Sequence, residues 1–584
     1  MRERCIAYCL IPTADPHLSE YLPARWRVRE WLSGFTGSAG TLLVGAEFAG
    51  LWTDSRYFEQ AGRELDGSGI ELMRLAVPHT PEHLQWLREH VREGERVACA
   101  ADMLSLAGAH SLRRVLQECG AQPAGDDLPG AIWSDRPGLP AAPIFEHPIE
   151  YAIRTPAEKL AAVREAMRER AATHHLVSAL DEIAWLTNLR GSDIEYNPVF
   201  LAHLLMGAQS ATLFVDREKL EADLRARLSK DGFKIVDYAD ITQALAALPS
   251  GSKLLLDPQR VCLQIAQAIP ANIDTIEAPG PIAALKAHKS EAELARVRET
   301  MRRDGVALVR AARWLEEALA RGERPTEPDV DEKLRELRAQ QPGFVSESFS
   351  TIAGYQANAA LPHYRATPES HAMLHPRGML LIDSGGQYLG GTTDITRVWA
   401  LGETTDEQRR DVTLVLKGVI ALSRAKFPRG TSGQQLDALA RAPIWASGVD
   451  YGHGTGHGVG YCLNVHEGPQ AIRPPRSMSS LEPLDVGMIT SIEPGIYKPG
   501  RHGVRIENLV ATLVAGSGEF GEFLAFETLT LCPIDTRLLE RDLLEPGETA
   551  WLDQYHARVR EQLAPLLEDA GDRVWLEARC APLS

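Results

Sequence analysis

A ladder of glycines constrains residues 450–469, DYGHGTGHGVGYCLNVHEGP, more than any other feature constrains a segment of this chain. Glycine stands at every second position from 452 to 460. Each glycine in a helix interior costs about 1 kcal/mol relative to alanine, so a zinc-binding HxxxH helix is disfavoured here. The segment also lacks GxxxxGK[ST] and a complete GxGxxG, which disfavours a phosphate-binding loop. The pattern therefore predicts extended backbone or a loop.

Three histidines, His453, His457 and His466, lie in this glycine-rich segment. In extended backbone His453 and His457 would point to the same side, because they are an even number of residues apart. The neighbouring glycines would leave room for a ligand or another chain segment to approach closely. A single histidine is more often structural, but three in such a segment favour a functional site whose other ligands come from elsewhere in the chain.

The composition is that of a globular protein, and its charge predicts no binding to nucleic acid. The chain has 584 residues, which predicts roughly three domains, and its apolar and charged contents of 44% and 24% are ordinary. The net charge of −17 opposes binding to a polyanion, because nucleic-acid affinity depends on lysine and arginine neutralising phosphates. Eight cysteines without a paired CxxC spacing predict a reducing, cytoplasmic setting.

No segment predicts insertion into a membrane. No stretch approaches about 18 consecutive apolar residues, the length that a transmembrane helix needs. The amino-terminal MRERCIAYCLIPTADPH has a short apolar run but no small-residue cleavage site, so we expect a strand there rather than a signal peptide.

The order of the predicted elements divides the chain into residues 1–148, 149–286 and 287–584. We interpret the first two as α/β domains, since strands such as 41–44 alternate with helical patterns such as 104–119 and 156–176. FTGSAGTLLV in the first and DEIAWLTNLRGSDIEYNPVF in the second hold comparable places, which suggests a distant duplication. In the third, Ser290 and Glu293 have the spacing of a capping box that opens a helix reaching about residue 320.

Two pairs of acidic residues follow buried strands in the third region. Asp383 ends the apolar run 379–382, and Asp394 follows eleven residues later, after two glycine pairs. Glu493 follows the run 489–492 and precedes a proline, and Glu507 belongs to the expected strand VRIENLV at 504–510. Arg505 and Glu507 would lie on one face of that strand. Each acid taken alone would be an ordinary residue at a turn or strand end.

Taken together, the four carboxylates and one of the histidines form a plausible ligand set for two divalent cations. Two carboxylates about 4 Å apart without a cation would repel each other by about 4 kcal/mol at an effective dielectric constant of ~20. Oxygen-rich ligands with one imidazole and no thiolate favour manganese, with cobalt or zinc as possible substitutes.

These residues resemble the pita-bread metallopeptidases, and within them the Xaa-Pro aminopeptidases of the long, three-domain type. The resemblance covers nearly the whole chain. It depends on the following ordered segments: LPHY at 361–364, LLIDSGGQYLGGTTDITR, HGTGHGVGYCLNVHEGP, SIEPGIY and VRIEN, with FTGSAGT and WTDSRYF in the first domain. It implies two related creatinase-like α/β domains followed by a pita-bread catalytic domain of mixed α/β and α+β structure, with a C-terminal extension from about residue 522.

The resemblance also implies roles for individual residues. The family's five metal ligands fall on Asp383, Asp394, His457, Glu493 and Glu507, of which Asp394 and Glu507 would bridge both ions. Its substrate-side histidines fall on His363, His453 and His466, its second-shell arginine falls on Arg505, and Arg56 of WTDSRYF is a candidate substrate contact. A hydroxide bridging the metals would attack the first peptide bond of a peptide with proline in second place, and Glu493 would shuttle the proton.

The sequence leaves other functions open. A prolidase would use the same ligands on Xaa-Pro dipeptides, but the length and the C-terminal extension favour the aminopeptidase. Methionine aminopeptidases usually have only the catalytic domain. A non-catalytic pita-bread protein that binds peptides would be expected to have lost ligands, whereas all five are present. The resemblance also suggests a homodimer.

Overall fold

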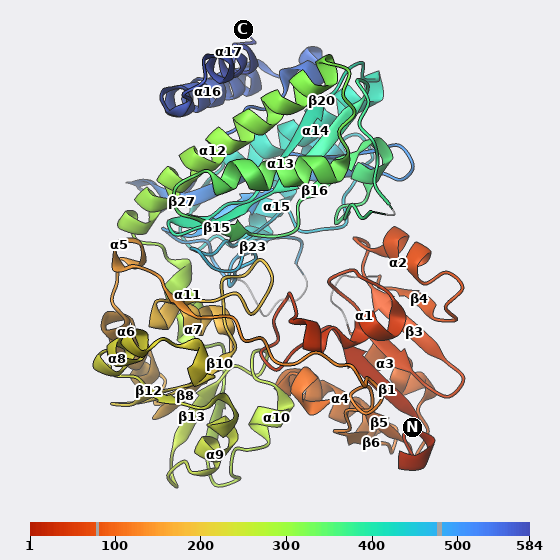
Figure 1. The fold of residues 1–584 in the computed structure, drawn as a ribbon, viewed down its shortest axis with the longest axis vertical. Helices are drawn as coiled ribbons and strands as arrows, with labels where there is room; N and C mark the ends of the chain where they lie inside the picture. Colours follow the sequence, from red (N-terminus) through yellow and green to blue (C-terminus); the bar gives the residue numbers. More distant parts are fainter. Residues whose placement is uncertain (77–80, 369, 476–481, 584) are drawn as a thin grey trace. The chain divides into compact units, whose positions relative to one another are not determined.

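The structure, a computed structural model of the chain, describes residues 1–76, 81–368, 370–475 and 482–583. It contains two compact units, residues 1–285 and 286–584, which we describe one at a time. Figure 1 labels their helices and strands. The further division of the first unit at residue 148 stays a prediction. Among the described residues, no helix combines the length and the apolar character that crossing a membrane would require.

The first unit holds two six-stranded sheets of one topology. In order across the sheet, the first contains β4 (Glu71–Arg74), β3 (Ala49–Thr53), β2 (Thr41–Val44), β1 (Tyr8–Pro12), β5 (Arg96–Ala98) and β6 (Gln122–Ala124). The second contains, in the same order, β12 (Lys234–Val236), β11 (Ala211–Val215), β10 (Ala202–Gly207), β8 (His174–Val177), β13 (Lys253–Leu256) and β14 (Asp274–Glu277). Parallel and antiparallel pairs occur at the same places in both. This match supports the suggested duplication.

Helices flank these sheets. They are α1 (Val28–Ser33), α2 (Phe58–Glu64), α3 (Glu82–His90), α4 (Leu106–Glu118), α5 (Ile149–Ala152), α6 (Pro156–Glu169), α7 (Leu180–Thr187), α8 (Ala222–Lys230), α9 (Ile241–Ala246) and α10 (Leu263–Ala266). One predicted boundary is wrong: the helical pattern that we read from 156 to 176 ends at Glu169. Ala171 adopts a positive φ of 54°, and residues 174–177 then pair with β10 and β13, so sheet pairing overrides local helical propensity.

The second unit begins with the predicted capping box. The side chain of Ser290 accepts a hydrogen bond from the backbone of Glu293, whose carboxylate accepts one from the Ser290 N–H, and α12 (Glu291–Ala320) follows. The helix therefore has the start and the length that the sequence predicts. The other helices are α13 (Glu327–Ala339), α14 (Asp406–Ser423), α15 (Gly433–Trp445), α16 (Pro546–Leu563) and α17 (Ala570–Arg579).

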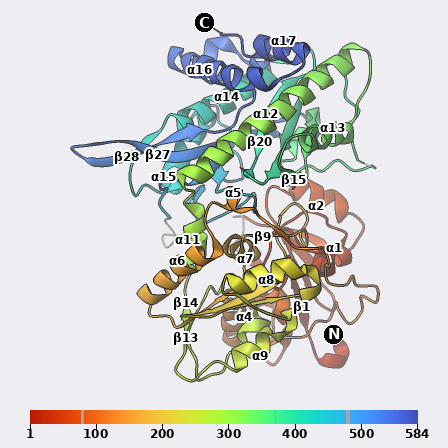
Figure 2. The same cartoon turned by 60° about the vertical axis from the view of Figure 1, so that its left-hand side comes forward.

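The strands of the second unit form several small sheets. Two of the sheets have three strands: one contains β16 (Ile352–Tyr355), β17 (Met379–Ser384) and β20 (Ile395–Ala400), and the other β15 (Phe344–Glu347), β18 (Gly386–Tyr388) and β19 (Gly391–Thr392). A four-stranded sheet contains β21 (Lys426–Pro428), β28 (Gly521–Thr528), β27 (Asn508–Gly518) and β24 (Ile489–Ile492). Two further sheets are pairs, β22 (Gly456–His457) with β23 (Ala471–Ile472) and β25 (Gly495–Lys498) with β26 (His502–Arg505). Figure 2 shows the β27–β28 hairpin extending away from the rest of this unit.

The predicted strand over 504–510 is in fact two strands. Arg505 ends β26 and Asn508 begins β27, and these strands pair with different partners, β25 and β24. Glu507 lies in the break between them and its N–H bonds to the Thr396 carbonyl. Arg505 and Glu507 are thus not on one strand, although both side chains contact the Thr396 hydroxyl.

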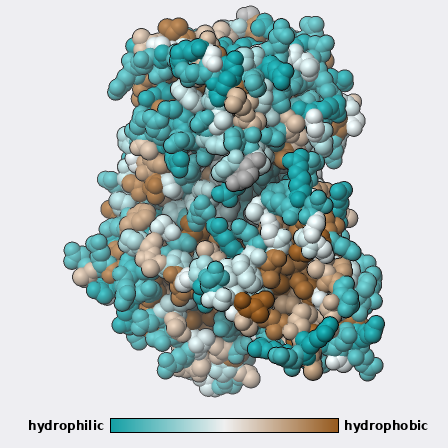
Figure 3. Space-filling model, turned by 45° about the vertical axis from the view of Figure 1, so that its right-hand side comes forward, coloured by the Kyte–Doolittle hydropathy of each residue, from teal (hydrophilic) through white to brown (hydrophobic). Residues whose placement is uncertain are grey.

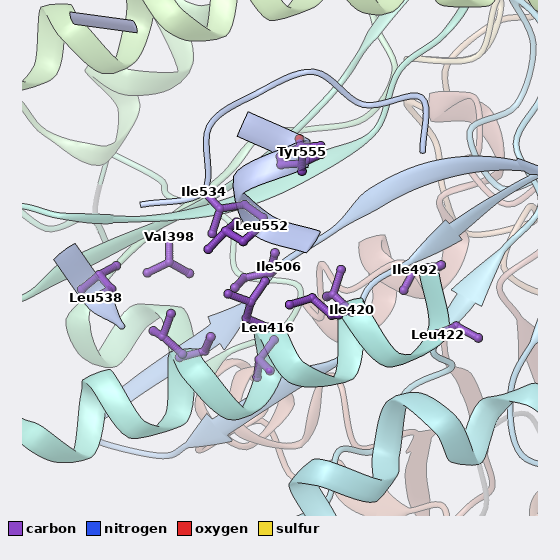
Figure 4. Packing of buried hydrophobic residues seen from close by; sticks show 14 of the residues in the cluster. Val398, Leu416, Ile420, Leu422, Ile492, Ile506, Ile534, Leu538, Leu552 and Tyr555 are labelled. Carbon is purple, nitrogen blue, oxygen red and sulfur yellow. The ribbon is translucent and has the colours of Figure 1, made fainter. Parts of the chain in front are cut away.

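An apolar core lies behind these strands. Leu416 and Ile420 of α14 point toward Ile506, and Ile534 lies beside Leu552 of α16 (Figure 4). All five are buried, so this core holds the strands of the second unit between α14 and the C-terminal helices. Hydrophilic side chains cover much of the molecular face shown in Figure 3.

In the first unit, two buried histidines join segments that are far apart in the sequence. The Nδ1 atom of His17 donates to the Ser178 carbonyl at 2.8 Å, so its Nε2 accepts from the Tyr238 hydroxyl at 2.8 Å. The ring of His203 lies 4.5 Å from that of His17 and stacks on Tyr238. Burial lowers the pKa of both histidines, and for His203 the neighbouring His17 adds to the effect. Both are held in the neutral form.

This arrangement predicts a loss of stability in mild acid. Because the folded pKa values of His17 and His203 lie below the value of about 6.5 in the unfolded chain, unfolding takes up protons below that pH. Each histidine should then cost about 1.4 kcal/mol of unfolding free energy per pH unit. The free energy of unfolding of the first unit, measured with urea between pH 7.5 and 5.5, should depend less on pH in His203→Phe than in the wild type. The substitution keeps an aromatic ring at this position.

His90→Phe is the matched control, since His90 is exposed on α3 of the same unit. It should leave the pH dependence as in the wild type. Equal dependence on pH in the wild type and in His203→Phe would show that this cluster does not carry the effect.

Candidate metal centre

Five chain segments bring the predicted acidic residues and His457 to one place in the second unit. Asp383 lies within β17 and faces Thr396 of β20 in the antiparallel register. Asp394 immediately precedes β20, and His457 ends β22. Glu493 follows β24, and its N–H bonds to the Thr455 carbonyl at 2.8 Å. With Glu507 in the break after β26, each side chain comes from the end of a strand or from just beside one.

The donor atoms of these residues lie close together. One ligand atom from each of Asp394, His457 and Glu507 lies within 4.8 Å of the other two. The Nε2 atom of His457 is 3.4 Å from Asp394 Oδ2 and 3.4 Å from Glu493 Oε1. The Asp394 and Glu507 side chains are buried, and His457 is half-buried.

Two carboxylate oxygens in this cluster have no protein partner among the described residues. Asp383 Oδ1 and Glu507 Oε1 are buried and accept no hydrogen bond. The second oxygen of each acid is held, since Arg505 donates to Asp383 Oδ2 and the Thr396 hydroxyl donates to Glu507 Oε2 at 2.9 Å. Buried oxygens left without a donor are expensive, and hard divalent cations are bound by such oxygens. The donor set fits divalent cations.

The electrostatics of the cluster point the same way. Burial, together with the charge of Asp394, raises the pKa of Glu493 to about 7, although His457 opposes the shift. Burial also raises the pKa of Asp383 and, with the charge of Asp394, raises that of Glu507 well above its usual value. Burial alone would lower the pKa of His457, but the hydrogen bond with Asp394 and the charge of Glu493 raise it to about 9. Each raised carboxyl pKa comes first from burial of the charged form and then from neighbouring carboxylates, and nearby positive charge would relieve both.

A chain of hydrogen bonds runs from the acidic cluster to His453. Arg505, which holds Asp383, also donates from Nη1 to the Tyr497 hydroxyl oxygen at 2.8 Å. Because His453 Nδ1 donates to the Gly454 carbonyl at 2.7 Å, its Nε2 accepts from the Tyr497 hydroxyl at 2.8 Å. His453 therefore faces Tyr497, whereas His457 faces Asp394 and Glu493.

The backbone between the two histidines explains this difference. It bends at Gly452, His453 and Thr455 and becomes strand only at Gly456. The expectation that His453 and His457 point to the same side assumed an extended segment, and the backbone between them is strand only at residues 456–457. Of the two predicted alternatives, extended backbone or a loop, the loop describes residues 452–455.

Sequence reasoning missed two residues that the structure places beside the cluster. Tyr497 joins Arg505 to His453, and Thr396 joins Glu507 to Arg505 through hydrogen bonds of 2.9 and 3.1 Å. Both lie in segments that carried the resemblance, SIEPGIY and TTDITR. Because both are close in sequence to predicted ligands, the sequence could have indicated that they belong to the site.

Three further residues, His466, His363 and Arg56, were predicted to act on the substrate. The rings of His466 and His457 meet edge to face, with centroids 4.4 Å apart. His363 is half-buried in the turn after η6 (Gln356–Ala360). Arg56 belongs to the first unit, where its Nε donates to Asp54 at 2.7 Å.

Family models match four consecutive parts of the chain. Metallopeptidase family M24 matches residues 295–512, and the C-terminal region of peptidase M24 matches residues 522–583. Two models of the creatinase/prolidase N-terminal domain match residues 20–129 and 135–293. The predicted fold class, two creatinase-like α/β domains before a pita-bread domain, is confirmed.

Individual relatives show how much of the chain these similarities cover. Aminopeptidase P2 of Arabidopsis thaliana is 38% identical over 98% of this chain and 86% of its own length. The crystal structure of the X-prolyl aminopeptidase of Caenorhabditis elegans, described as a cytosolic enzyme with a di-nuclear active site, matches 99% of this chain with a TM-score of 0.94 and 34% identity, over 95% of its own length. The Xaa-Pro dipeptidase of Bacillus anthracis, at 26% identity and a TM-score of 0.50, matches 65% of this chain and 99% of its own.

The cluster of buried donors thus lies within the part of the chain that matches a metallopeptidase model, and similarity over nearly the whole chain extends to an enzyme described as having a di-nuclear active site. This chain belongs to metallopeptidase family M24.

Proposed function

We propose that this protein is a metal-dependent aminopeptidase that releases the N-terminal residue from peptides with proline in the second position. The observation that carries the proposal is the meeting of Asp394, His457 and Glu507 within 4.8 Å, beside buried carboxylate oxygens that accept no hydrogen bond from any described residue. Similarity over nearly the whole chain to proteins named aminopeptidase P and X-prolyl aminopeptidase supports the substrate class.

Two divalent ions would be held by Asp383, Asp394, His457, Glu493 and Glu507. Four carboxylates and one imidazole, without a thiolate, favour manganese, with cobalt or zinc as substitutes. When bound, the ions supply positive charge that lowers the pKa of a water molecule and polarises the substrate carbonyl.

The chain's own residues would orient the substrate and move the proton. Glu493 Oε1 accepts a hydrogen bond from the Ser491 hydroxyl at 3.1 Å, which fixes the carboxylate where it can carry a proton toward the leaving nitrogen. His466 would stabilise the oxygen of the reacting carbonyl, and His453 would do so once its ring turns away from the Gly454 carbonyl and frees its N–H. His363 would help to place the substrate. Arg505 would hold Asp383 and orient Tyr497.

The first two domains would narrow the access to a free N-terminus, with Arg56 as a candidate contact. Its pairing with Asp54 equally suits an ordinary structural arginine. An Arg56→Ala enzyme with unchanged kinetics on peptides of every length would favour that structural role.

The main alternative is a prolidase that acts on Xaa-Pro dipeptides. The dipeptidase of Bacillus anthracis matches 65% of this chain, whereas the relatives named as aminopeptidases match nearly all of it. A non-catalytic peptide-binding protein would not be expected to keep all five ligand positions. The longer match and the complete ligand set favour the aminopeptidase.

We also propose a cytoplasmic homodimer. The cytosolic description of the Caenorhabditis elegans enzyme and the lack of a paired CxxC spacing among the eight cysteines of the sequence support a reducing compartment. The dimer is proposed from the family resemblance alone.

Substrate length separates the aminopeptidase from the prolidase. Chelator-stripped protein supplied with manganese should release arginine from Arg-Pro-Pro and should cleave the dipeptide Gly-Pro at least about tenfold less efficiently in kcat/KM. Arg-Ala-Ala is the control for the requirement for proline. Preferential cleavage of Gly-Pro would identify a prolidase, and no cleavage of either peptide would contradict a peptidase function.

The two glycine-flanked histidines should differ when replaced. His453 Nε2 is engaged by Tyr497 and His457 Nε2 faces two carboxylates, so only His457→Ala should lose metal. His453→Ala should keep its metal and lose about 10² to 10³ of kcat, the scale of a lost oxyanion donor, with a smaller change in KM. Metal analysis and kinetics check both variants. Loss of metal from His453→Ala alone would mean that the two roles are exchanged.

A further inference from the structure

A buried carboxylate directly follows His466. Glu467 is 4% exposed, and its two oxygens pair with two lysines, Lys286 Nζ at 2.6 Å from Oε2 and Lys289 Nζ at 2.8 Å from Oε1. Lys286 and Lys289 are themselves only 4% and 5% exposed. Lys289 Nζ also donates to the Val459 carbonyl at 2.8 Å. One lysine therefore holds both the start and the end of the segment between His457 and His466.

This segment closes on itself. In residues 458–470, which we call the histidine loop, the Glu467 N–H bonds to the Gly458 carbonyl at 2.8 Å, and the Gly458 N–H bonds to the Gln470 carbonyl at 3.2 Å. A side chain at Gly458 would come within 2.0 Å of the Glu467 carbonyl oxygen. The closure places the ring of His466 against that of His457.

The two lysines reach the loop from firmly held backbone. Lys286 lies in the last turn of α11 (Pro281–Ala287), and Lys289 immediately precedes the capping box of α12. The Lys289 N–H bonds to the Gly487 carbonyl at 3.1 Å. Gly487 has a φ of +87°, and a Cβ there would approach the Lys289 carbonyl oxygen to 2.3 Å. The side chains of the two lysines can therefore hold the loop in one position.

Stability alone is a poor explanation for such a cluster. Removing charges from water is costly, and well-packed apolar residues often stabilise a protein as well as a buried ion pair does. Buried charged groups are better attested as devices that fix one arrangement among several. Here the fixed element is the loop that carries His466.

We propose that Lys286 and Lys289 are positioning residues: through Glu467 and the Val459 carbonyl they lock the histidine loop so that His466 stands beside His457. The proposal deepens the proposed function, on which only its kinetic consequences rest. His457 has supports of its own, because its N–H bonds to the Ser491 hydroxyl at 2.9 Å and β22 pairs with β23. Loss of the lysine contacts should therefore affect His466 more than metal binding.

The test uses the full-length, manganese-loaded protein and two readouts. Glu467→Gln keeps the shape of the side chain and removes its charge, and Lys289→Met removes the contacts with Glu467 and Val459. Both should speed amide hydrogen exchange in residues 458–470 by about tenfold or more. Both should also lower kcat on Arg-Pro-Pro by about tenfold or more, with KM and the manganese dissociation constant within about threefold of the wild type.

The matched control is another buried ion pair of the same unit. Arg338 of α13 donates from Nε to Asp304 of α12 at 2.8 Å, and the two residues are 0% and 2% exposed. Arg338→Met should leave exchange in the histidine loop, and kcat per folded molecule, as in the wild type. If Lys289→Met does not fold, Glu467→Gln and the paired Lys286→Met/Glu467→Gln variant, which leaves fewer unpaired charges, decide the question.

The outcomes are distinguishable. Wild-type exchange and kcat in Glu467→Gln would overturn the proposal, and so would equal losses in Glu467→Gln and Arg338→Met. Metal affinity falling as far as kcat would also overturn it, because the loop would then act through His457. If the wild type cleaves no peptide, the proposed function fails, while hydrogen exchange still decides whether the lysines fix the loop.

Discussion

Mutual repulsion among buried carboxylates is the constraint on which the second unit depends. Asp394, Glu493 and Glu507 lie close to the His457 imidazole, and the charge of Asp394 also acts on Asp383. At an effective dielectric constant of ~20, two carboxylates about 4 Å apart repel each other by about 4 kcal/mol. Arg505, Thr396 and Ser491 satisfy only some of their oxygens. The remaining oxygens and the raised pKa values of Asp383, Glu493 and Glu507 are the marks of a site that divalent cations complete.

Rigid backbone holds these groups against that repulsion. The buried guanidinium of Arg397 donates to the Glu507 carbonyl at 2.6 Å, to Asn508 Oδ1 at 2.8 Å and to the Tyr555 hydroxyl at 2.8 Å. It thereby ties β20 to the break between β26 and β27 and to α16 of the C-terminal region. Tyr555 also belongs to the apolar core shown in Figure 4. The C-terminal helices thus support the strands beside the proposed ligands, which gives them a structural part in the candidate site.

Much of this arrangement could be predicted from the sequence, because short motifs carry it. Apolar runs that end in acids predicted β17 and β24, and Ser290 with Glu293 predicted the start of α12, since both signals are local. The break at Glu507 could not be predicted in this way. VRIENLV reads as one strand, and only the pairing of its two halves with β25 and β24 divides it.

Contacts between residues far apart in the sequence could not be predicted either. Nothing near Lys286 or Lys289 in the sequence indicates that both lysines meet Glu467 some 180 residues later. The same holds for the bends at 452–455, which turn His453 toward Tyr497 although its spacing from His457 suggested a shared direction. Such features depend on tertiary contacts, which local patterns do not encode.

The most direct test of the central claim is the position of the metal ions themselves. Crystals grown with manganese and measured for anomalous scattering should show two peaks about 3.5–4 Å apart, as in other two-metal sites. The ligands should be Asp383, Asp394, His457, Glu493 and Glu507, with Asp394 and Glu507 touching both ions. A single peak, or a site in which His453 replaces His457, would contradict the account.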